Sequence, residues 1–263
     1  MMGSILRSLK RFIVIALSKM PSTSLEAIEK LFQEANGKGF GTSSIELEVR
    51  LFKTELGFLN ITTPTLIDLG GNIGAWILEF KKVYPESEIY ILEPSPAAFE
   101  KLVSNTKNLK NINVYNLAVD IENGTRLLHS DQPGSGMASL YERNLDHFGI
   151  EIQSTESVEC IKIDDFIQQN EITPNCLKID IEGHELSILR SVSSIGQKFR
   201  VILFEFGGCN IDSQTYFREF WYFFKSNNYT LFRVSPSGLK KIKKYNESLE
   251  TFRTTNYIAV AQD

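Results

Sequence analysis

From Thr65 to the C-terminus, short apolar runs alternate with segments whose apolar residues recur at helical spacing. Strands that alternate with helices along a chain are typical of a mostly parallel sheet with helices on both faces. The sequence therefore predicts an α/β fold, a Rossmann-like, doubly wound sheet of seven strands. The predicted strands are 65–69, 88–92, 112–118, 176–180, 200–205, 229–234 and 256–261, and the predicted helices are 73–84, 96–106, 184–191 and 213–225.

One stretch interrupts this alternation, between Gly124 and Ile163. Residues 125–129 and 157–163 are predicted as two further strands, which flank a loop rich in glycine and serine. Loops at the rim of such a sheet commonly form the walls of a substrate pocket. We therefore expect the loop segment 134–141 to help frame the mouth of a pocket.

The first 62 residues have a different, helical pattern. The segments Thr23–Glu26 and Ser43–Glu46 each resemble a capping box, in which a hydroxyl and a glutamate satisfy free amides at the start of a helix. The helices that they begin are expected to end near Asn36 and Leu59, with a glycine-rich loop between them. The predicted division of the chain is a helical cap or lid over residues 1–62 and a Rossmann-like domain over residues 63–263.

The extreme N-terminus is basic, because residues 1–25 contain four basic residues and no acidic residue. Apolar residues recur at helical spacing from Ile5 to Met20, and Arg7, Lys10 and Arg11 lie on the other side of such a helix. We expect this helix to pack on its own domain. Peripheral contact with anionic lipid or with a partner is an alternative, as is a secretion signal. No membrane span is predicted, since no apolar run approaches the ~20 residues that a spanning helix needs.

The formal net charge of −4 gives no electrostatic reason for binding nucleic acid. The cysteines Cys160, Cys176 and Cys209 are widely spaced, so they form neither a disulfide framework nor a metal-binding quartet. They suit a reducing compartment, and we expect the protein to be cytoplasmic. The sequence does not indicate an oligomeric state.

A glycine-rich segment follows the first predicted strand, where residues 68–74 read Asp-Leu-Gly-Gly-Asn-Ile-Gly. In an open α/β sheet, ligands bind outside the carboxyl ends of the strands, and glycines allow a ligand to lie against bare backbone. The spacing is not that of a dinucleotide-binding fingerprint, because Leu69 stands where a glycine is needed. Asp68 is unfavourable for a pyrophosphate but suits a ligand with an amino group, although a carboxylate at a helix start is also stabilised by the helix dipole. These features disfavour a nicotinamide-dependent oxidoreductase, which remains an alternative.

Glu93 ends the second predicted strand, 19 residues after Gly74. An acid at this place accepts hydrogen bonds from both hydroxyls of a ribose. Together with Asp68, it suggests a nucleoside that carries an amino-acid tail and no pyrophosphate. S-adenosylmethionine fits that description.

A second cluster of ionisable residues, Asp180, Glu182, His184 and Glu185, lies at a later strand-to-helix turn. Asp180 or His184 could act as a general base that removes the proton of an acceptor hydroxyl. Alternatively, Asp180 and Glu182 could hold a divalent cation, or the acids could serve only to stabilise the helix start. A dedicated zinc site is not expected, because no second histidine or cysteine is nearby. Glu205, at the end of another strand, could orient His184 or bind the acceptor.

The chain resembles the FkbM-type methyltransferases, from about Lys38 to the C-terminus. These enzymes use S-adenosylmethionine, and many methylate hydroxyl groups of sugars or of natural products. A catalytically inactive binding module is an alternative, but the motifs are intact. The resemblance rests on the segments 68–74, 93–96, 118–120 and 178–185, with Phe99 and Asn105.

The resemblance implies an S-adenosylmethionine-dependent O-methyltransferase whose acceptor is a small molecule or a glycan. No metal site is assigned, and a divalent cation is the less favoured version. The implied cofactor-binding residues are Asp68, Gly70, Gly71, Asn72 and Gly74 around the methionine part, Glu93, Pro94 and Ser95 at the ribose, Ala118 and Val119 at the adenine, and Asp180 at the methyl group. The implied catalytic residues are Asp180, Glu182 and His184.

Overall fold

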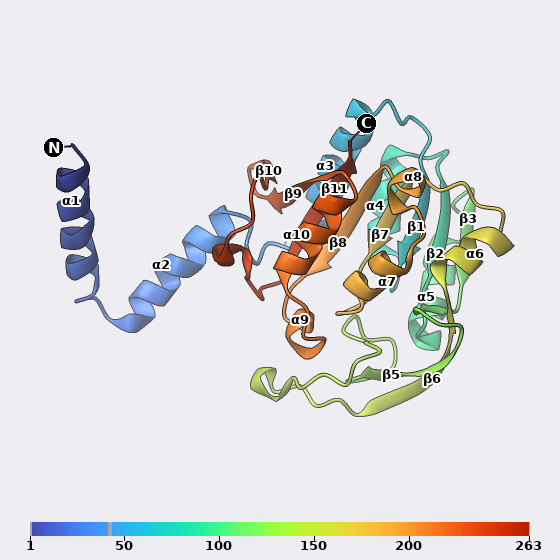
Figure 1. Ribbon diagram of the computed structural model, residues 1–263. Helices are drawn as coiled ribbons and strands as arrows, with labels where there is room; N and C mark the ends of the chain where they lie inside the picture. The colour runs from blue at the N-terminus through green and yellow to red at the C-terminus, as the bar shows by residue number, and fades with distance from the viewer. Residues whose placement is uncertain (1, 42–43, 263) are drawn as a thin grey trace.

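The computed structural model describes residues 2–41 and 44–262 of the chain (Figure 1). Most strands belong to one sheet, in which neighbours are parallel on one side and antiparallel on the other. The order of its eight strands is β3 (Ile112–Tyr115), β2 (Glu88–Leu92), β1 (Thr65–Leu69), β7 (Cys176–Ile179), β8 (Val201–Phe206), β11 (Thr255–Ala261), β9 (Tyr229–Ser235) and β10 (Gly238–Lys241). The predicted seven-stranded α/β sheet is confirmed. The additional edge strand, β10, lacks an apolar signal because two of its four residues are lysines.

A smaller sheet of three strands lies beside the main one, at the bottom of Figure 1. Its order is β4 (Ala118–Val119), β6 (Ser154–Ile161) and β5 (Gly124–Ser130). The predicted strand 112–118 is thus divided, because the chain leaves the main sheet after β3 and enters the small one at β4. The amide of Asn116 fixes this turn by donating to the carbonyl oxygens of Glu93 (2.9 Å) and Pro94 (2.8 Å).

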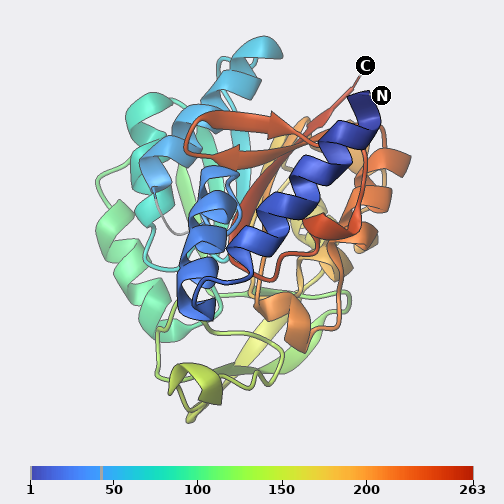
Figure 2. The same cartoon turned by 90° about the vertical axis from the view of Figure 1, so that its left-hand side faces the viewer.

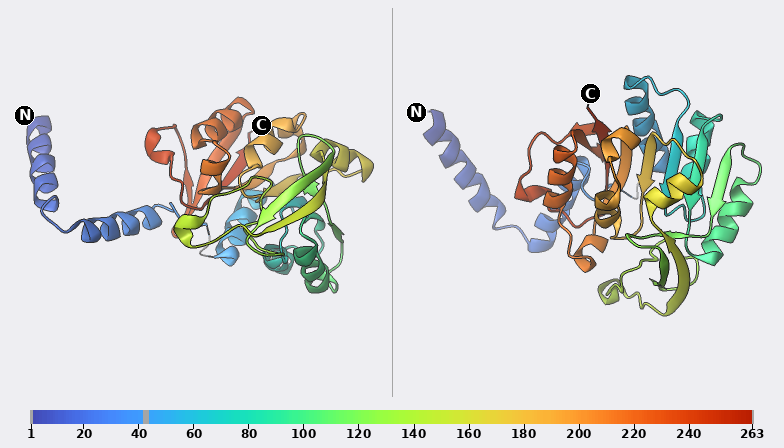
Figure 3. Two further views of the ribbon diagram at one scale, coloured as in Figure 1. Left: turned by 90° about the horizontal axis from the view of Figure 1, so that it is seen from below. Right: turned by 45° about the vertical axis from the view of Figure 1, so that its right-hand side comes forward.

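Helices cover both faces of the main sheet (Figures 1 and 3), and each face has its own hydrophobic cluster. One face is covered by α3 (Ile45–Phe58), α4 (Ala75–Val83) and α5 (Pro96–Thr106), and the other by α6 (Ile163–Gln169), α7 (Glu185–Ser191), α8 (Ile195–Lys198) and α10 (Phe217–Ser226). Short helical turns complete the fold at α9 (Cys209–Asp212), Asp146–Phe148 and Glu247–Leu249. Cys160, Cys176 and Cys209 are buried free thiols.

Two N-terminal helices, α1 (Met2–Leu17) and α2 (Ser22–Ala35), form an arm that extends away from this body (Figures 1 and 3). Figure 2 views the body from the side of the arm. The prediction that α1 packs on its own domain is wrong, because its side chains from Leu6 to Leu17 are exposed. The physical reason is that helices already cover both faces of the sheet.

The arm is joined to the body at the C-terminal end of α2. There the Arg233 side chain donates to the carbonyl oxygen of Asn36 at 2.8 Å, and Lys240 donates to that of Ala35 at 2.8 Å. The glycine-rich segment that follows is held to the start of β11, where Gly41 donates to the carbonyl oxygen of Thr254 at 2.9 Å.

The two predicted capping boxes have different outcomes. Pro21 precedes the first residue of α2, so Thr23 lies inside the helix and does not cap it. Ser44 caps α3, and its hydroxyl accepts a hydrogen bond from the amide of Leu47 at 3.1 Å. Ser43 lies outside the described residues.

Helix α3 is fixed to the body by an aromatic contact between α3 and α4. The Phe52 ring is fully buried and meets the rings of Trp76 and Phe80 edge-on, with centroids 5.8 and 6.1 Å apart. By contrast, Phe58 at the end of the same helix is 77% exposed. A comparison of Phe52 with Phe58 therefore separates the effect of packing on stability from the effect of the residue type.

We expect Phe52→Ala to lower the free energy of unfolding by about 3–5 kcal/mol, because it leaves a cavity in a packed cluster. Phe58→Ala is the matched control and should change the free energy by less than about 0.5 kcal/mol. Chemical denaturation followed by circular dichroism measures both. Equal losses for the two variants would contradict the packing described for α3.

Candidate functional site

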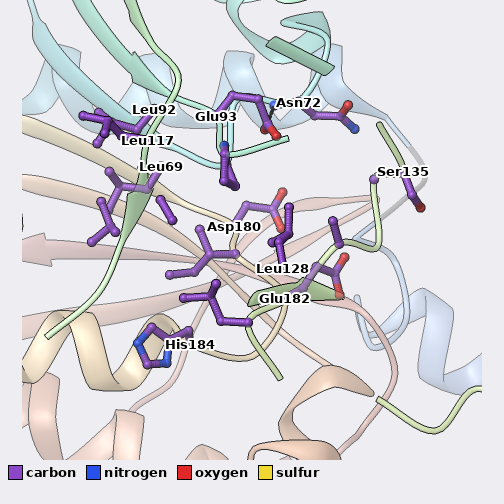
Figure 4. A pocket seen from close by; sticks show the side chains of 18 residues that line it. Leu69, Asn72, Leu92, Glu93, Leu117, Leu128, Ser135, Asp180, Glu182 and His184 are labelled. Atoms are coloured by element: carbon purple, nitrogen blue, oxygen red, sulfur yellow. Dashed lines mark hydrogen bonds between the residues drawn. The ribbon is translucent and has the colours of Figure 1, made fainter. Parts of the chain in front are cut away.

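A cavity opens where β1, β2 and β7 end, and residues of the small sheet and of the loop 134–141 close its other side (Figure 4). Its volume is about 580 Å³ when the space open to solvent at its mouth is included. Leu69, Leu92, Leu117, Leu128 and Leu140 make apolar parts of the wall. The predicted site residues in the wall are Gly70, Asn72, Glu93, Pro94, Ala118, Val119, Asp180, Glu182 and His184.

Gly70 brings the two predicted motifs together. Its φ of +83° lies in the left-handed region, and its amide donates to the carbonyl oxygen of Leu92 at 2.9 Å. A Cβ atom at this position would overlap the carbonyl oxygen of Asp180. The ends of β1 and β7 can therefore lie this close only because residue 70 is glycine.

Gly71 and Gly74 lie behind the cavity wall and serve packing. A Cβ atom at residue 71 would collide with the side chain of Ile91, and one at residue 74 would lie 2.7 Å from Leu102 of α5. Gly74 also has a φ of +84° and precedes the first residue of α4. These two glycines shape the strand-to-helix turn that carries Gly70 and Asn72.

Glu93 directly follows β2 and is held by backbone amides. Its two carboxylate oxygens accept hydrogen bonds from the amides of Asn72 (2.7 Å) and Ser95 (2.9 Å). Burial raises the pKa of the Glu93 carboxyl to about 7. Each oxygen keeps a further lone pair, so the carboxylate can accept two more hydrogen bonds from a ligand.

Ser95 lies behind the wall and joins it to the insertion. Its hydroxyl donates to the carboxylate of Glu156 in β6 at 3.0 Å and accepts from the amide of Gly134 at 3.1 Å. The end of β2 and the loop 134–141 are therefore fixed relative to each other. Neighbouring Pro94 contributes to the wall itself.

Asp68 is only 1% exposed and forms a buried ion pair with Lys178 of β7, at 3.1 Å between Oδ1 and Nζ. Lys178 Nζ also lies 3.6 Å from the carboxylate of Asp180. Burial raises the pKa of Asp68, and the adjacent Lys178 ammonium opposes that rise. Asp68 thus lies behind the cavity wall, and its contact with the cavity is indirect, through Lys178 beside Asp180.

The side chain of Asn72 carries an unsatisfied acceptor. Asn72 lines the cavity, and its buried Oδ1 atom has no hydrogen-bond partner among the described residues. A buried amide oxygen without a partner costs free energy unless a ligand or water supplies a donor. Asn72 is therefore suited to bind a donor group of a ligand.

Asp180 and Glu182 differ in their surroundings. The Asp180 side chain is 41% exposed and lies between Glu93 and His184 in the cavity (Figure 4). Glu182 is paired with Arg143 at 2.5 Å, and Arg143 is also 3.2 Å from Asp212. Burial and the Asp180 charge raise the pKa of Glu182.

Glu185 closes the turn on which these residues lie. Its fully buried carboxylate accepts from the amides of Ile181 (3.0 Å) and Gly183 (3.1 Å), and burial raises its pKa to about 7. Gly183 has a φ of +109°, and a Cβ atom there would meet the backbone of Cys209 at 2.9 Å. Glu185 is thus a structural member of the acidic cluster.

Both ring nitrogens of His184 have partners. Nε2 lies 2.9 Å from a carboxylate oxygen of Asp120, and Nδ1 lies 3.1 Å from the hydroxyl of Tyr141. Asp120 is in turn paired with Arg126 at 2.7 Å. A carboxylate accepts only, so Nε2 carries the proton and Nδ1 is the basic nitrogen.

Sequence reasoning did not identify these partners as site residues. Asp120 and Tyr141 are 64 and 43 positions from His184, and Arg143 is 39 positions from Glu182. Asp120 directly follows the Ala118-Val119 pair of the family motif, so the signal for it was present. Tyr141 and Arg143 lie in the irregular loop, where no periodicity predicts the direction of a side chain.

Glu205 does not share the hydrogen bonds of His184. It lies beside Glu182 and Cys209, and one potential ligand atom from each residue falls within 4.8 Å of the others. Glu182 is already paired with Arg143, and burial raises the pKa of the Cys209 thiol. These contacts disfavour a resident cation here.

A family model for the methyltransferase FkbM domain matches residues 68–231 of the chain. Methyltransferase 1 of Beauveria bassiana is 27% identical over 143 residues, which are 48% of this chain and 57% of the relative. The hexuronic acid methyltransferase AglP of Haloferax volcanii is 28% identical over 148 residues, 53% of this chain and 54% of the relative. The chain therefore matches little more than half the length of these relatives.

A third relative is the 2-O-methyltransferase NoeI of Sinorhizobium fredii, which is 21% identical over 191 residues, 68% of this chain and 76% of the relative. Among solved structures, the FkbM methyltransferase of Methylobacillus flagellatus superimposes with a TM-score of 0.43 at 16% identity, over 75% of this chain and 44% of that one.

The close approach at Gly70 yields a test of how the two motifs are joined. Gly70→Ala should lower the free energy of unfolding by more than the roughly 1–2 kcal/mol that left-handed backbone costs, because the added methyl also overlaps Asp180. Gly57→Ala is the control, since it lies in α3 with nothing within 4 Å of the added Cβ. It should be neutral or stabilising by up to about 1 kcal/mol. Thermal unfolding of both variants measures these changes. A Gly70→Ala protein as stable as wild type would contradict the close approach of residue 70 to Asp180.

Proposed function

The chain belongs to the FkbM methyltransferase domain family, and from this we propose that it transfers a methyl group from S-adenosylmethionine to a hydroxyl of a sugar, glycan or natural-product acceptor. The observation that carries the proposal is that Glu93 and His184 line the same cavity. Glu93 is suited to bind the hydroxyls of a ribose, and His184 is suited to accept a proton. One relative, a hexuronic acid methyltransferase, supports a sugar acceptor, and another, a 2-O-methyltransferase, supports transfer to an oxygen atom.

The residues of the cavity fit this cofactor. Glu93 has two free lone pairs for the two ribose hydroxyls, and Leu92, Leu117 and Val119 offer apolar surface to an adenine ring. The unpartnered oxygen of Asn72 suits the ammonium group of the methionine part. Asp68 would act indirectly, by holding Lys178 beside Asp180. When bound, S-adenosylmethionine supplies a methyl group on a positively charged sulfur.

His184 is the group that we propose to accept the proton of the acceptor hydroxyl. Asp120 fixes the proton on Nε2, so the Nδ1 lone pair faces the Tyr141 hydroxyl within the cavity region. The ion pair with Arg126 holds Asp120 in place. Asp180 lies between His184 and Glu93 (Figure 4), where its carboxylate would face the positively charged sulfur of a bound cofactor. Methyl transfer by displacement depends mainly on orientation, so this rigid placement should contribute as much as the base.

A cation held by Asp180 and Glu182 is the competing mechanism. It is disfavoured because the Glu182 carboxylate is occupied by Arg143. If a chelator stops the reaction and the His184→Ala protein stays active, the mechanism uses a cation and not His184 as the base.

The activity itself is tested with the intact protein, S-adenosylmethionine and a panel of uronic acids, neutral sugars and oligosaccharides. Mass spectrometry should show products heavier by one methylene group. Calorimetry should show binding of S-adenosylhomocysteine and none of NAD. Binding of NAD alone would revive the oxidoreductase alternative, and cofactor binding without any methylated product would favour an inactive binding module.

The pKa of Glu93 makes cofactor binding depend on pH. The carboxylate form accepts four hydrogen bonds, whereas protonation removes an acceptor, so affinity for S-adenosylhomocysteine should fall by up to about tenfold per pH unit below about 7. Glu93→Gln should weaken binding by about 1.5–3 kcal/mol and abolish this pH dependence.

Glu88→Gln is the matched control for that experiment, because Glu88 begins the same strand and is exposed. It should leave both the affinity and its pH dependence unchanged in calorimetry. A Glu93→Gln protein that keeps the wild-type pH profile would show that another group causes it.

For the proton acceptor, His184→Ala should lower kcat by about 10²–10⁴-fold and leave the affinity for S-adenosylhomocysteine nearly unchanged. Asp120→Asn should also lower kcat, because an amide no longer fixes the proton on Nε2. His147→Ala, at an exposed histidine, is the control and should have no effect. A fall in kcat for Tyr141→Phe as large as that for His184→Ala would mean that the proton passes through the Tyr141 hydroxyl.

A further inference from the structure

The arm formed by α1 exposes an amphipathic surface that the methyltransferase site does not use. Large apolar side chains are exposed along the helix, with Leu6 at 69% and Phe12 at 70%. The body does not cover these side chains, because the arm extends away from the body (Figures 1 and 3). Exposed apolar surface of this extent normally marks a contact with another molecule or with a membrane.

The two faces of α1 differ in chemistry. At 100° per residue, Leu6, Leu9, Phe12, Ile13 and Leu17 fall within one apolar sector. Arg7, Lys10 and Arg11 fall on the remaining side, together with Ser8 and the apolar Val14 and Ile15. A helix with one apolar and one basic face can lie in the interface of a bilayer, with its apolar side toward the acyl chains.

The first 25 residues, which include α1, differ in charge from the rest of the chain. Residues 1–25 carry four basic and no acidic residues, so they contribute +4 of a total of −4. The rest of the chain therefore has 24 basic and 32 acidic residues, a net charge of −8. An anionic surface would attract residues 1–25 and repel the rest of the chain, which restricts such a contact to α1.

The length of α1 decides how it would lie. A helix of 16 residues is about 24 Å long, shorter than the roughly 30 Å hydrocarbon core of a bilayer. No helix in the described part of the chain is long and apolar enough to span a membrane. A helix of this length can lie along the surface of a bilayer.

We propose that α1 anchors the protein to an anionic membrane surface, with its apolar sector among the acyl chains and its basic side chains among the headgroups. A second copy of the chain would cover the apolar sector but leave the basic residues without anions. An anionic bilayer satisfies both faces at once. The hydrogen bonds from Arg233 and Lys240 to the C-terminal end of α2 then join the body to the arm.

The test is flotation of the full chain with two kinds of vesicle, phosphatidylcholine alone and phosphatidylcholine with phosphatidylglycerol. The wild-type protein should float with the anionic vesicles only, and less at high salt. Arg7→Glu/Lys10→Glu/Arg11→Glu should reduce binding roughly tenfold or more. Lys241→Glu/Lys243→Glu/Lys244→Glu is the control, because it makes the same charge change at exposed body residues and should float like wild type.

A second pair of variants tests the apolar sector. Phe12→Glu should abolish flotation, whereas Phe148→Glu, at a body residue that is 69% exposed, should not. Melting temperatures of the α1 variants should match wild type because α1 does not pack on the body, and those of the control variants should match because their residues are exposed. Absence of wild-type binding to anionic vesicles, or equal losses in arm and control variants, would overturn the proposal. A dimer in light scattering that Phe12→Glu dissociates, without vesicle binding, would assign the face to a second copy instead.

Discussion

A buried lysine ammonium lies between β1 and β7 at the point where both strands end. Lys178 pairs with the fully enclosed Asp68 and lies near the half-exposed Asp180, so one cation links the motif of the first strand to that of the later one. Removing one partner of such a buried pair costs about 3–5 kcal/mol, because the other charge is left uncompensated. The glycine at position 70 makes this geometry accessible by letting the two strand ends touch. The placement of Asp180 in the cavity follows from these two constraints.

The other side of the cavity depends on polar contacts made by the insertion. Ser95 holds Gly134 and Glu156, and Ser139 donates to the carbonyl oxygen of Glu182 at 2.8 Å. Tyr141 and Arg143 continue this contact to His184 and Glu182. The proposed base, His184, and the neighbouring Glu182 are therefore oriented from a segment that is separate from the main sheet.

The sequence predicts the main sheet well because its signals are local. The bounds of β1, β2 and α5 match the predicted 65–69, 88–92 and 96–106, since each is a short apolar run or a helical pattern bounded by glycine or proline. Family membership and most of the cavity wall could be predicted for the same reason. The partners of His184 could not, because they come from distant, irregular segments. The position of α1 was also missed, since its periodicity indicates a helix with an apolar face but not what covers that face.

The insertion begins and ends at one place. Ala118 and Val119 of β4 pair with Cys160 and Ile161 of β6, so the intervening forty-odd residues leave and return at adjacent backbone positions. The length and composition of the tip beyond β5 can therefore change without shifting the register of any strand in the main sheet. The tip, which carries Tyr141 and Arg143, could therefore be exchanged as a unit while the strand ends that carry Gly70 and Glu93 keep their places in the main sheet.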